Sequence, residues 1–211
     1  MDAKLLIISG PSGCGKGSIC RELLKRNDFW FSVSATTRPP REGEIDGVHY
    51  FFVSQQRFDE MIEQGELLEY VRKYKRSYGT PKAPMLEHLA KGQNVVLEIE
   101  MIGALNVKKV YPEAELIFII PPSLETLHER LLTRGTESEE QINIRTLEIK
   151  KELEEIVKYD YYVVNDDLMK AVSDVEAIAY GNGEEFRINE VNSREYLSKI
   201  EEEYNALISR S

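Results

Sequence analysis

The residues best suited to chemistry form a glycine-rich loop after the first apolar run of the chain. Residues 10–16 read Gly-Pro-Ser-Gly-Cys-Gly-Lys and match the first seven positions of the phosphate-binding pattern G-x-x-x-x-G-K. Glycines let backbone N–H groups converge on phosphate oxygens, and a following helix adds the positive end of its dipole. A glycine-rich turn without a ligand is the alternative, and the preceding strand, the spacing and the lysine disfavour it. We therefore expect a nucleoside triphosphate to be bound by Gly10, Pro11, Ser12, Gly13, Cys14, Gly15, Lys16, Gly17 and Ser18.

The loop departs from the strict pattern at the position that usually ligates magnesium. Gly17 stands where serine or threonine is usual, and Ser18 follows it. We expect Ser18 to bond a phosphate oxygen, with Mg²⁺ held mainly by nucleotide phosphates and water. The three histidines lie far apart in the sequence, so no metal site formed by protein side chains is predicted.

The elements that must position this loop follow an alternating pattern. Continuous apolar runs at 5–9, 95–99, 116–120 and 161–164 are typical of buried parallel strands. Helices are predicted between them: at 84–91, beginning at Pro84 and ending at Gly92; after Ser123; and from a capping box at Ser138 to about residue 157. Another amphipathic helix is expected from Asn192 onward. The pattern predicts an α/β fold with a parallel core sheet flanked by helices.

Residues 34–82 differ from this pattern. They are polar and rich in turn residues, and they include a probable strand at 50–53, which favours an inserted lobe with some antiparallel sheet. Its segments 34–44, 47–53, 65–70 and 77–81 carry a close resemblance to the guanylate kinase family, and the resemblance extends from about residue 4 to 172. It implies a P-loop nucleoside monophosphate kinase fold that transfers a phosphoryl group from ATP to GMP, giving ADP and GDP. The implied divisions are a core of 1–33, 83–124 and 156–211, a mixed α/β GMP-binding lobe of 34–82 and a helical lid of 125–155.

The resemblance also implies which residues would bind GMP. Arg38, Arg41, Tyr50 and Tyr78 match positions that contact the phosphate, and Ser34, Glu69 and Thr80 match positions that contact the base. Guanine presents N1–H and an N2 amino group along one edge, which suits a carboxylate acceptor. Adenine lacks that amino group and would leave a buried carboxylate unpaired. Glu69 is therefore the residue expected to select the base.

Other matching positions contain departures. Glu100 stands where the family usually has aspartate, Ile102 replaces a usual glutamine, and Lys75-Arg76 replaces a usual Gly-Asn. Glu100 is expected to accept from guanine or to approach the water shell of the metal.

Arg134 and Arg145 match the arginines of the family's lid. With Lys16 and Arg38 they are the expected catalytic residues, because they can neutralise charge on the transferring group. Arg145 could instead pair with Glu148 or Glu152. Residues 165–167 resemble a segment near the ATP base.

Composition limits the alternatives. The net charge of −10 over 211 residues argues against nonspecific nucleic-acid binding. The start of the chain lacks a signal-peptide pattern, and the sequence lacks a membrane-length apolar run. With two cysteines that form no disulfide framework, we expect a cytoplasmic protein, with homo-oligomer formation left open.

Rival functions are a kinase for AMP, CMP or UMP, a binding module without catalysis, and a generic ATPase. The base-contacting residues Ser34, Glu69 and Thr80 argue against a kinase for another base. Lys16 and the lid arginines argue against a binding module without catalysis, and the acceptor lobe argues against a generic ATPase.

Overall fold

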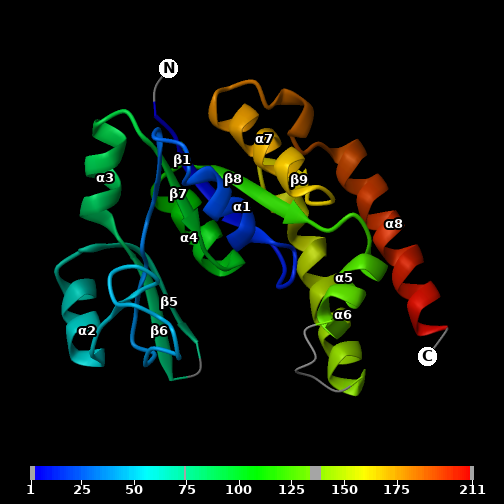
Figure 1. The fold of residues 1–211 in the computed structure, drawn as a ribbon, viewed down its shortest axis with the longest axis horizontal. Coiled ribbons are helices and arrows are strands. Elements are labelled where there is room, and N and C mark those ends of the chain that lie inside the picture. Colours follow the sequence, from blue (N-terminus) through cyan, green and yellow to red (C-terminus); the bar gives the residue numbers. More distant parts are fainter. Residues whose placement is uncertain (1–2, 74, 134–138, 210–211) are drawn as a thin grey trace. The chain divides into compact units, whose positions relative to one another are not determined.

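The computed structural model describes residues 3–73, 75–133 and 139–209. The chain forms two compact units. One comprises Leu24–Glu115 with the N-terminal residues up to Ile7, and the other comprises Ile8–Leu23 with the residues from Leu116 onward. Figure 1 labels most of their helices and strands.

The larger sheet has the strand order β2-β7-β1-β8-β9. Its strands are β1 (Leu5–Ser9), β2 (Phe29–Phe31), β7 (Asn94–Glu98), β8 (Glu115–Ile120) and β9 (Tyr161–Val164). The pairs β2–β7 and β8–β9 are parallel. Residues along β1, β7 and β8 are buried on successive positions, which is why these strands read as continuous apolar runs rather than alternating ones. The four predicted core strands are confirmed within a residue of their expected bounds.

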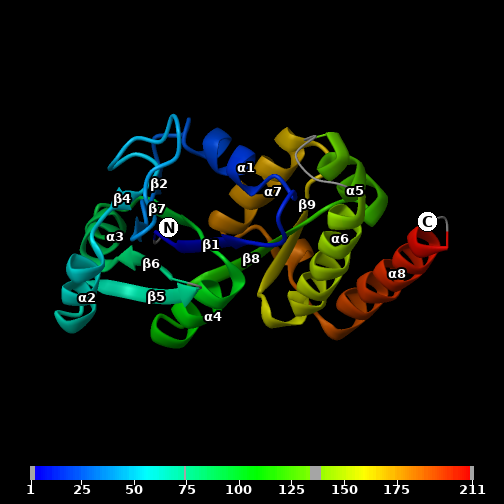
Figure 2. The ribbon, with the colours of Figure 1, turned by 90° about the horizontal axis from the view of Figure 1, so that it is seen from below.

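The first unit also contains a smaller sheet with the order β4-β3-β6-β5. Its strands are β3 (Ala35–Thr36), β4 (Phe51–Phe52), β5 (Leu67–Lys73) and β6 (Arg76–Pro81). β3 pairs with β4 in parallel, whereas β6 runs antiparallel to both β3 and β5. Helix α2 (Gln55–Glu63) lies beside this sheet, as Figure 2 shows, and buries Phe58 and Met61 against Ala35.

Two further helices of the first unit follow these strands: α3 (Lys82–Ala90) and α4 (Met101–Val110). The prediction that the first of them begins at Pro84 is wrong by two residues. Pro84 lies inside the first turn, where a proline costs little because the N–H groups there have no partner within the helix. The predicted end is confirmed: Gly92 has a φ of +80° just after the last helical residues.

The second unit contains α1 (Lys16–Leu23), α5 (Leu124–Thr133), α6 (Glu139–Leu153), the 3₁₀ turns η1 (Glu154–Lys158) and η2 (Glu184–Phe186), α7 (Leu168–Ala179) and α8 (Glu190–Ile208). The helix predicted after Ser123 is confirmed as α5, and its residues Leu124, Leu127 and Leu131 are all buried. The capping box predicted at Ser138 lies outside the described residues. Helix α8 begins two residues earlier than predicted because the Asn189 side chain caps it.

Candidate active site

The phosphate-binding loop joins β1 to α1 in the second unit. Gly10, Gly13 and Gly15 all have positive φ angles, of 134°, 92° and 84°. A Cβ atom on Gly10 would lie 2.3 Å from the carbonyl oxygen of Ile119, and one on Gly15 would lie 2.2 Å from Asn165 Nδ2. The loop therefore packs too closely for side chains at these positions and leaves a bare backbone turn at the start of a helix, which is the cradle a phosphate needs.

Two cations predicted from the sequence act at this loop. Lys16 Nζ donates to the carbonyl oxygens of Gly10 and Pro11 at 2.6 and 2.9 Å. Arg145, on α6, donates from Nη2 to Ser12 Oγ at 2.8 Å, although the two residues are 133 positions apart. The fold thus brings the side chain of Arg145 to the loop. Arg134 lies outside the described residues.

A buried contact supports the loop from the end of β9. Asn165 Nδ2 donates to the carbonyl oxygen of Cys14 at 2.7 Å, and Arg130 Nη2 donates to the carbonyl oxygen of Asn165 at 3.2 Å. The sequence had suggested Asn165 only for the ATP base, and it had missed Arg130. The available signal was helical spacing, because Arg130 precedes the expected Arg134 by four positions.

The thiol of Cys14 is buried under this contact. Burial raises its pKa to about 12, and the nearby charges of Lys16 and Arg130 offset only part of that rise. Cys14 therefore contributes its backbone to the loop, while its side chain remains a neutral thiol.

The residues expected to bind the acceptor phosphate gather in the first unit. The Arg38 side chain is only 5% exposed and makes a bidentate pair with Glu44, with both N–O distances at 2.8 Å. The pair holds the pKa of Glu44 at about 2, and it raises the pKa of Arg38. Glu44 also accepts from the backbone N–H of Arg41 at 2.6 Å. Glu44 was not predicted as a site residue; it lies six positions after Arg38, across the proline turn.

Aromatic rings complete this cluster. The Arg38 guanidinium lies 5.4 Å from the ring centre of Tyr50 and 5.7 Å from that of Phe52. Tyr50 meets Tyr78 edge to face at 6.2 Å between ring centres. The structure thus brings together Arg38, Tyr50 and Tyr78 as the sequence predicted, whereas the Arg41 side chain is exposed.

A second cluster contains the predicted base-selecting carboxylate. Glu69, on β5, is 8% exposed, and its Oε1 accepts a 2.8 Å hydrogen bond from the hydroxyl of Thr80, on β6. Burial raises the pKa of Glu69, and the Thr80 hydroxyl opposes part of that rise. On the other side, a Cβ atom on Gly103 would lie 3.0 Å from Glu69 Oε2, so the carboxylate packs directly on the first turn of α4. Ser34 is half-buried beside β3, where its carbonyl oxygen accepts from the N–H of Phe51.

Glu100 occupies a different environment from Glu69. It precedes α4, its side chain is 70% exposed, and its Oε2 lies 3.1 Å from Lys73 Nζ. The two carboxylates predicted for guanine therefore differ physically: one is buried and bonded to a hydroxyl, and the other is exposed and paired with a cation.

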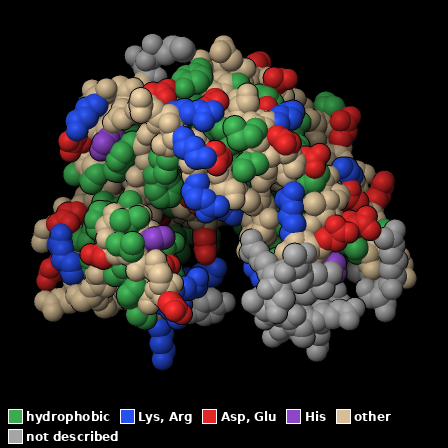
Figure 3. Space-filling model, viewed as in Figure 1, with side chains coloured by type: hydrophobic (Ala, Val, Ile, Leu, Met, Phe, Trp, Pro, Cys, Tyr) green, Lys and Arg blue, Asp and Glu red, His purple; other side chains and the backbone are tan. Residues whose placement is uncertain are grey.

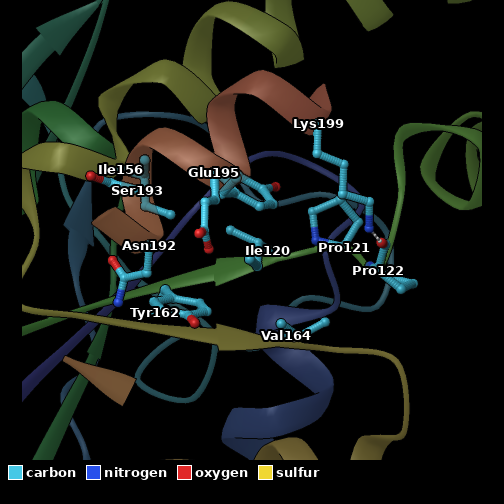
Figure 4. Close-up of a pocket in the computed structure, with 11 residues that line it drawn as sticks. Ile120, Pro121, Pro122, Ile156, Tyr162, Val164, Asn192, Ser193, Glu195 and Lys199 are labelled. Carbon is cyan, nitrogen blue, oxygen red and sulfur yellow. Dashed lines mark hydrogen bonds between the residues drawn. The ribbon is translucent and has the colours of Figure 1, made fainter. Parts of the chain in front are cut away.

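Acidic and basic side chains are interspersed over the face drawn in Figure 3. A separate cavity of about 310 Å³ lies within the second unit, and Figure 4 shows its lining. Its walls include Ile120, Pro121, Tyr162, Val164, Tyr196 and Lys199, and they include none of the predicted site residues. The cavity is therefore distinct from the phosphate-binding loop and from the Arg38 and Glu69 clusters.

Within the described part of the chain, helices are too short or too polar to cross a membrane. In the same residues, no group of three or more His, Cys, Asp or Glu side chains is arranged to hold a metal ion.

Comparisons with known proteins identify the family of this chain. Residues 2–180 match the protein-family model described as guanylate kinase. The chain is 54% identical over 175 residues to a guanylate kinase of Clostridioides difficile, covering 82% of this chain and 85% of that one. It is 49% identical over 200 residues to a guanylate kinase of Caldanaerobacter subterraneus, covering 94% and 95%. The crystal structure of guanylate kinase from Anaplasma phagocytophilum superposes with a TM-score of 0.69 at 25% identity, covering 94% of this chain and 96% of that one. This chain belongs to the guanylate kinase family.

Proposed function

We propose that this protein transfers the γ-phosphoryl group of ATP to GMP, producing ADP and GDP. The observation that carries the proposal is the buried carboxylate of Glu69, bonded to Thr80 in the same unit that holds the cluster of Arg38, Tyr50 and Tyr78. A buried carboxylate needs a donor partner, because burying it without one costs several kcal/mol, on the order of 1–3 or more. The guanine edge supplies N1–H and N2–H donors for that role.

Base selection follows from the same chemistry. Adenine would present a lone pair at N1 and no N2 amino group. The Glu69 carboxylate would then face an acceptor and lack the two donors that guanine offers. Sites built to hydrogen-bond a substrate reject an analogue that lacks the donor by about 10⁴ or more. We assign Glu69 the main selective role, with Thr80 holding its carboxylate and Ser34 as a further contact to the base.

The GMP phosphate is assigned to Arg38, Arg41, Tyr50 and Tyr78. Glu44 already holds the Arg38 guanidinium in a fixed orientation, and the ring of Tyr50 lies beside it. A planar guanidinium that is held in place loses little further freedom when it binds an anion. The exposed side chain of Arg41 would add a second cation to the bound phosphate.

ATP is assigned to the loop of residues 10–18. The close approach of its glycines to Ile119 and Asn165 fits a backbone cradle for phosphate oxygens, with Lys16 and Arg145 as its cations. Magnesium would neutralise phosphate charge when bound, and the loop offers it Ser18 rather than a hydroxyl at residue 17. We therefore assign the metal mainly to nucleotide phosphates and water.

Little covalent help is needed from the protein. A phosphate monoester has a second pKa near 6, so GMP is mostly dianionic at neutral pH and needs no general base. The task is to hold two anions in line and offset their repulsion, which Lys16, Arg38 and Arg145 can do. We also assign Arg134 to this task and treat residues 125–155 as a lid and 34–82 as the GMP-binding lobe.

The proposal is tested by coupled measurement of ADP formation from Mg-ATP with GMP, AMP, CMP and UMP in separate reactions. We expect turnover with GMP alone, abolished by Lys16→Ala, while circular dichroism shows an intact fold. Turnover with another monophosphate would keep the kinase class and remove the role given to Glu69. A folded protein that turns over none of the four would contradict the proposed function.

A further inference from the structure

Strand β5 presents two charged side chains to the start of α4. Along β5, Glu69 and Lys73 are four residues apart, so the alternation of the strand places them on one face. Glu69 packs against Gly103, and Lys73 pairs with Glu100, so both contacts are made to the first turn of α4 or the residue before it. The opposite face is identified by Arg72, whose guanidinium pairs with Asp59 of α2 at 2.6 Å.

The pairing changes what Glu100 can do. Lys73 engages Oε2 of Glu100 at 3.1 Å, and the Glu100 side chain is 70% exposed, so a ligand can still reach its carboxylate. Without a cation beside it, this carboxylate would add a second negative charge to the wall that already carries Glu69. A charge of that sign would repel a nucleotide whose phosphate is a dianion at neutral pH.

The ion pair also limits the rotamers of Glu100. Glutamate has three side-chain torsions, and ordering them on binding costs conformational entropy. The ion pair with Lys73 of β5 therefore positions the Glu100 carboxylate before GMP binds.

We propose that Lys73 is a positioning residue for GMP: it holds the Glu100 carboxylate against β5 and balances its charge beside the base-binding cluster. This inference rests on the proposed function, since it concerns the same acceptor site. Lys73 itself is not assigned a contact with GMP. It acts through Glu100, so substituting Lys73 should change the affinity for GMP and leave the rate of phosphoryl transfer unchanged.

The matched variants are Lys73→Met and Arg72→Met. Each removes one positive charge and one exposed ion pair from adjacent positions of β5, but only the first releases Glu100. At low salt we expect Lys73→Met to raise the KM for GMP about threefold to fivefold, because a strong exposed ion pair contributes about that factor. The kcat and the KM for ATP should stay unchanged. Arg72→Met is expected to leave the KM for GMP within about twofold, because surface pairs are commonly worth little.

A double-mutant cycle with Glu100→Gln tests whether Lys73 acts through Glu100. Adding Lys73→Met to Glu100→Gln should raise the KM for GMP no further, because the carboxylate that Lys73 positions is already absent. Isothermal titration with GMP alone should give the same ranking, and 0.5 M salt, roughly ten times the low-salt condition, should shrink the difference.

Equal effects of Lys73→Met and Arg72→Met, or additive effects of Lys73→Met and Glu100→Gln, would overturn the positioning role. Failure of the proposed function has a different signature, because the wild-type protein would then neither bind nor phosphorylate GMP. A protein that is active on GMP but insensitive to Lys73→Met contradicts only the inference about Lys73.

Discussion

The hydroxyl of Thr80 donates a 2.8 Å hydrogen bond to Glu69 Oε1, and both side chains are buried. The burial and the hydrogen bond shift the pKa of the Glu69 carboxyl in opposite directions. Burial raises the pKa of Glu69 above its ordinary value of 4.5, and the hydrogen bond, which favours the ionised form, lowers it. The protonation of one side chain thereby governs whether the acceptor site can take two guanine donors.

GMP affinity is predicted to weaken as the pH falls through the pKa of Glu69. A protonated carboxyl has lost acceptor capacity, so the KM for GMP should rise on the acidic side while the KM for ATP stays level. Thr80→Val removes the bond that lowers the pKa and should move this acidic limb to higher pH. Steady-state kinetics between pH 5 and 8, roughly the range in which the fold survives, measure the shift. An acidic limb that stays in place in Thr80→Val would contradict the coupling.

The same pKa predicts a pH dependence of stability. The folded state retains the Glu69 proton at a pH where the unfolded chain has lost it. Stability from this group therefore decreases as the pH rises from about 4.5 through the raised folded pKa. Glu69→Gln should remove this decrease and raise the melting temperature relative to wild type more at pH 7 than at pH 4. Scanning calorimetry at the two pH values measures it, and an equal change at both would rule out the linkage.

The Arg38–Glu44 pair leads to a prediction about acceptor affinity. Glu44→Gln should raise the KM for GMP about tenfold, because a neutral amide holds the guanidinium less firmly than a bidentate carboxylate. Arg38→Lys should weaken binding further, because an ammonium cannot reproduce the planar fork. Glu66→Gln is a matched control, because it breaks the exposed Arg57–Glu66 pair elsewhere in the same unit. Improved GMP binding in Glu44→Gln would show that Glu44 competes with the phosphate instead of orienting Arg38.

The pair also has a stability signature with the opposite sign to that of Glu69. The folded pKa of Glu44, about 2, lies below its ordinary value of 4.5. Its contribution is therefore complete above about pH 4.5 and is lost as the pH falls toward 2. Acid unfolding followed by circular dichroism should therefore begin at a higher pH in Glu44→Gln than in wild type and be less steep in the variant. Superimposable acid transitions would contradict this prediction.

The phosphate-binding loop predicts a sharp dependence of activity on Gly15. Gly15→Ala would place a Cβ atom 2.2 Å from Asn165 Nδ2, so either the loop backbone moves or Asn165 gives up its hydrogen bond to the Cys14 carbonyl oxygen. A displacement near 1 Å in a catalytic element costs on the order of 100-fold in kcat/KM. Gly181→Ala is the control, because this glycine also has a positive φ, 77°, but has open space around its Cβ. Kinetics with varied ATP should separate the two variants, and equal losses would point to backbone strain alone.

Cys14 is predicted to resist thiol chemistry although it lies in the phosphate loop. Its pKa of about 12 leaves very little thiolate at pH 8, and the side chain is buried. Iodoacetamide at pH 8 should label neither Cys14 nor Cys20 in the folded protein but both in urea, as read by peptide mass spectrometry. Rapid labelling of Cys14 in the native state would contradict the burial.

The sequence predicted the core strands and the phosphate loop because both depend on local patterns. Continuous apolar runs indicate strands buried on both faces, and the loop is specified by glycines at fixed spacing followed by lysine. The acceptor residues Arg38, Tyr50, Glu69 and Thr80 were available only through resemblance to a family. The strand predicted at 50–53 contains β4, whereas β3 escaped prediction because two residues carry no measurable periodicity.

Tertiary structure decided the contacts between residues that are distant along the chain. Arg145 reaches Ser12 across 133 positions, and Asn165 supports the carbonyl of Cys14 across 151, and neither contact has a local signal. The same is true of the environments of Glu69 and Glu100. Both are glutamates near helix α4, but one is buried against Gly103 and the other is exposed beside Lys73. The sequence by itself determined which chemical groups are present, whereas packing determined their burial and partners, and these set the charge each group carries and the ligand it can accept.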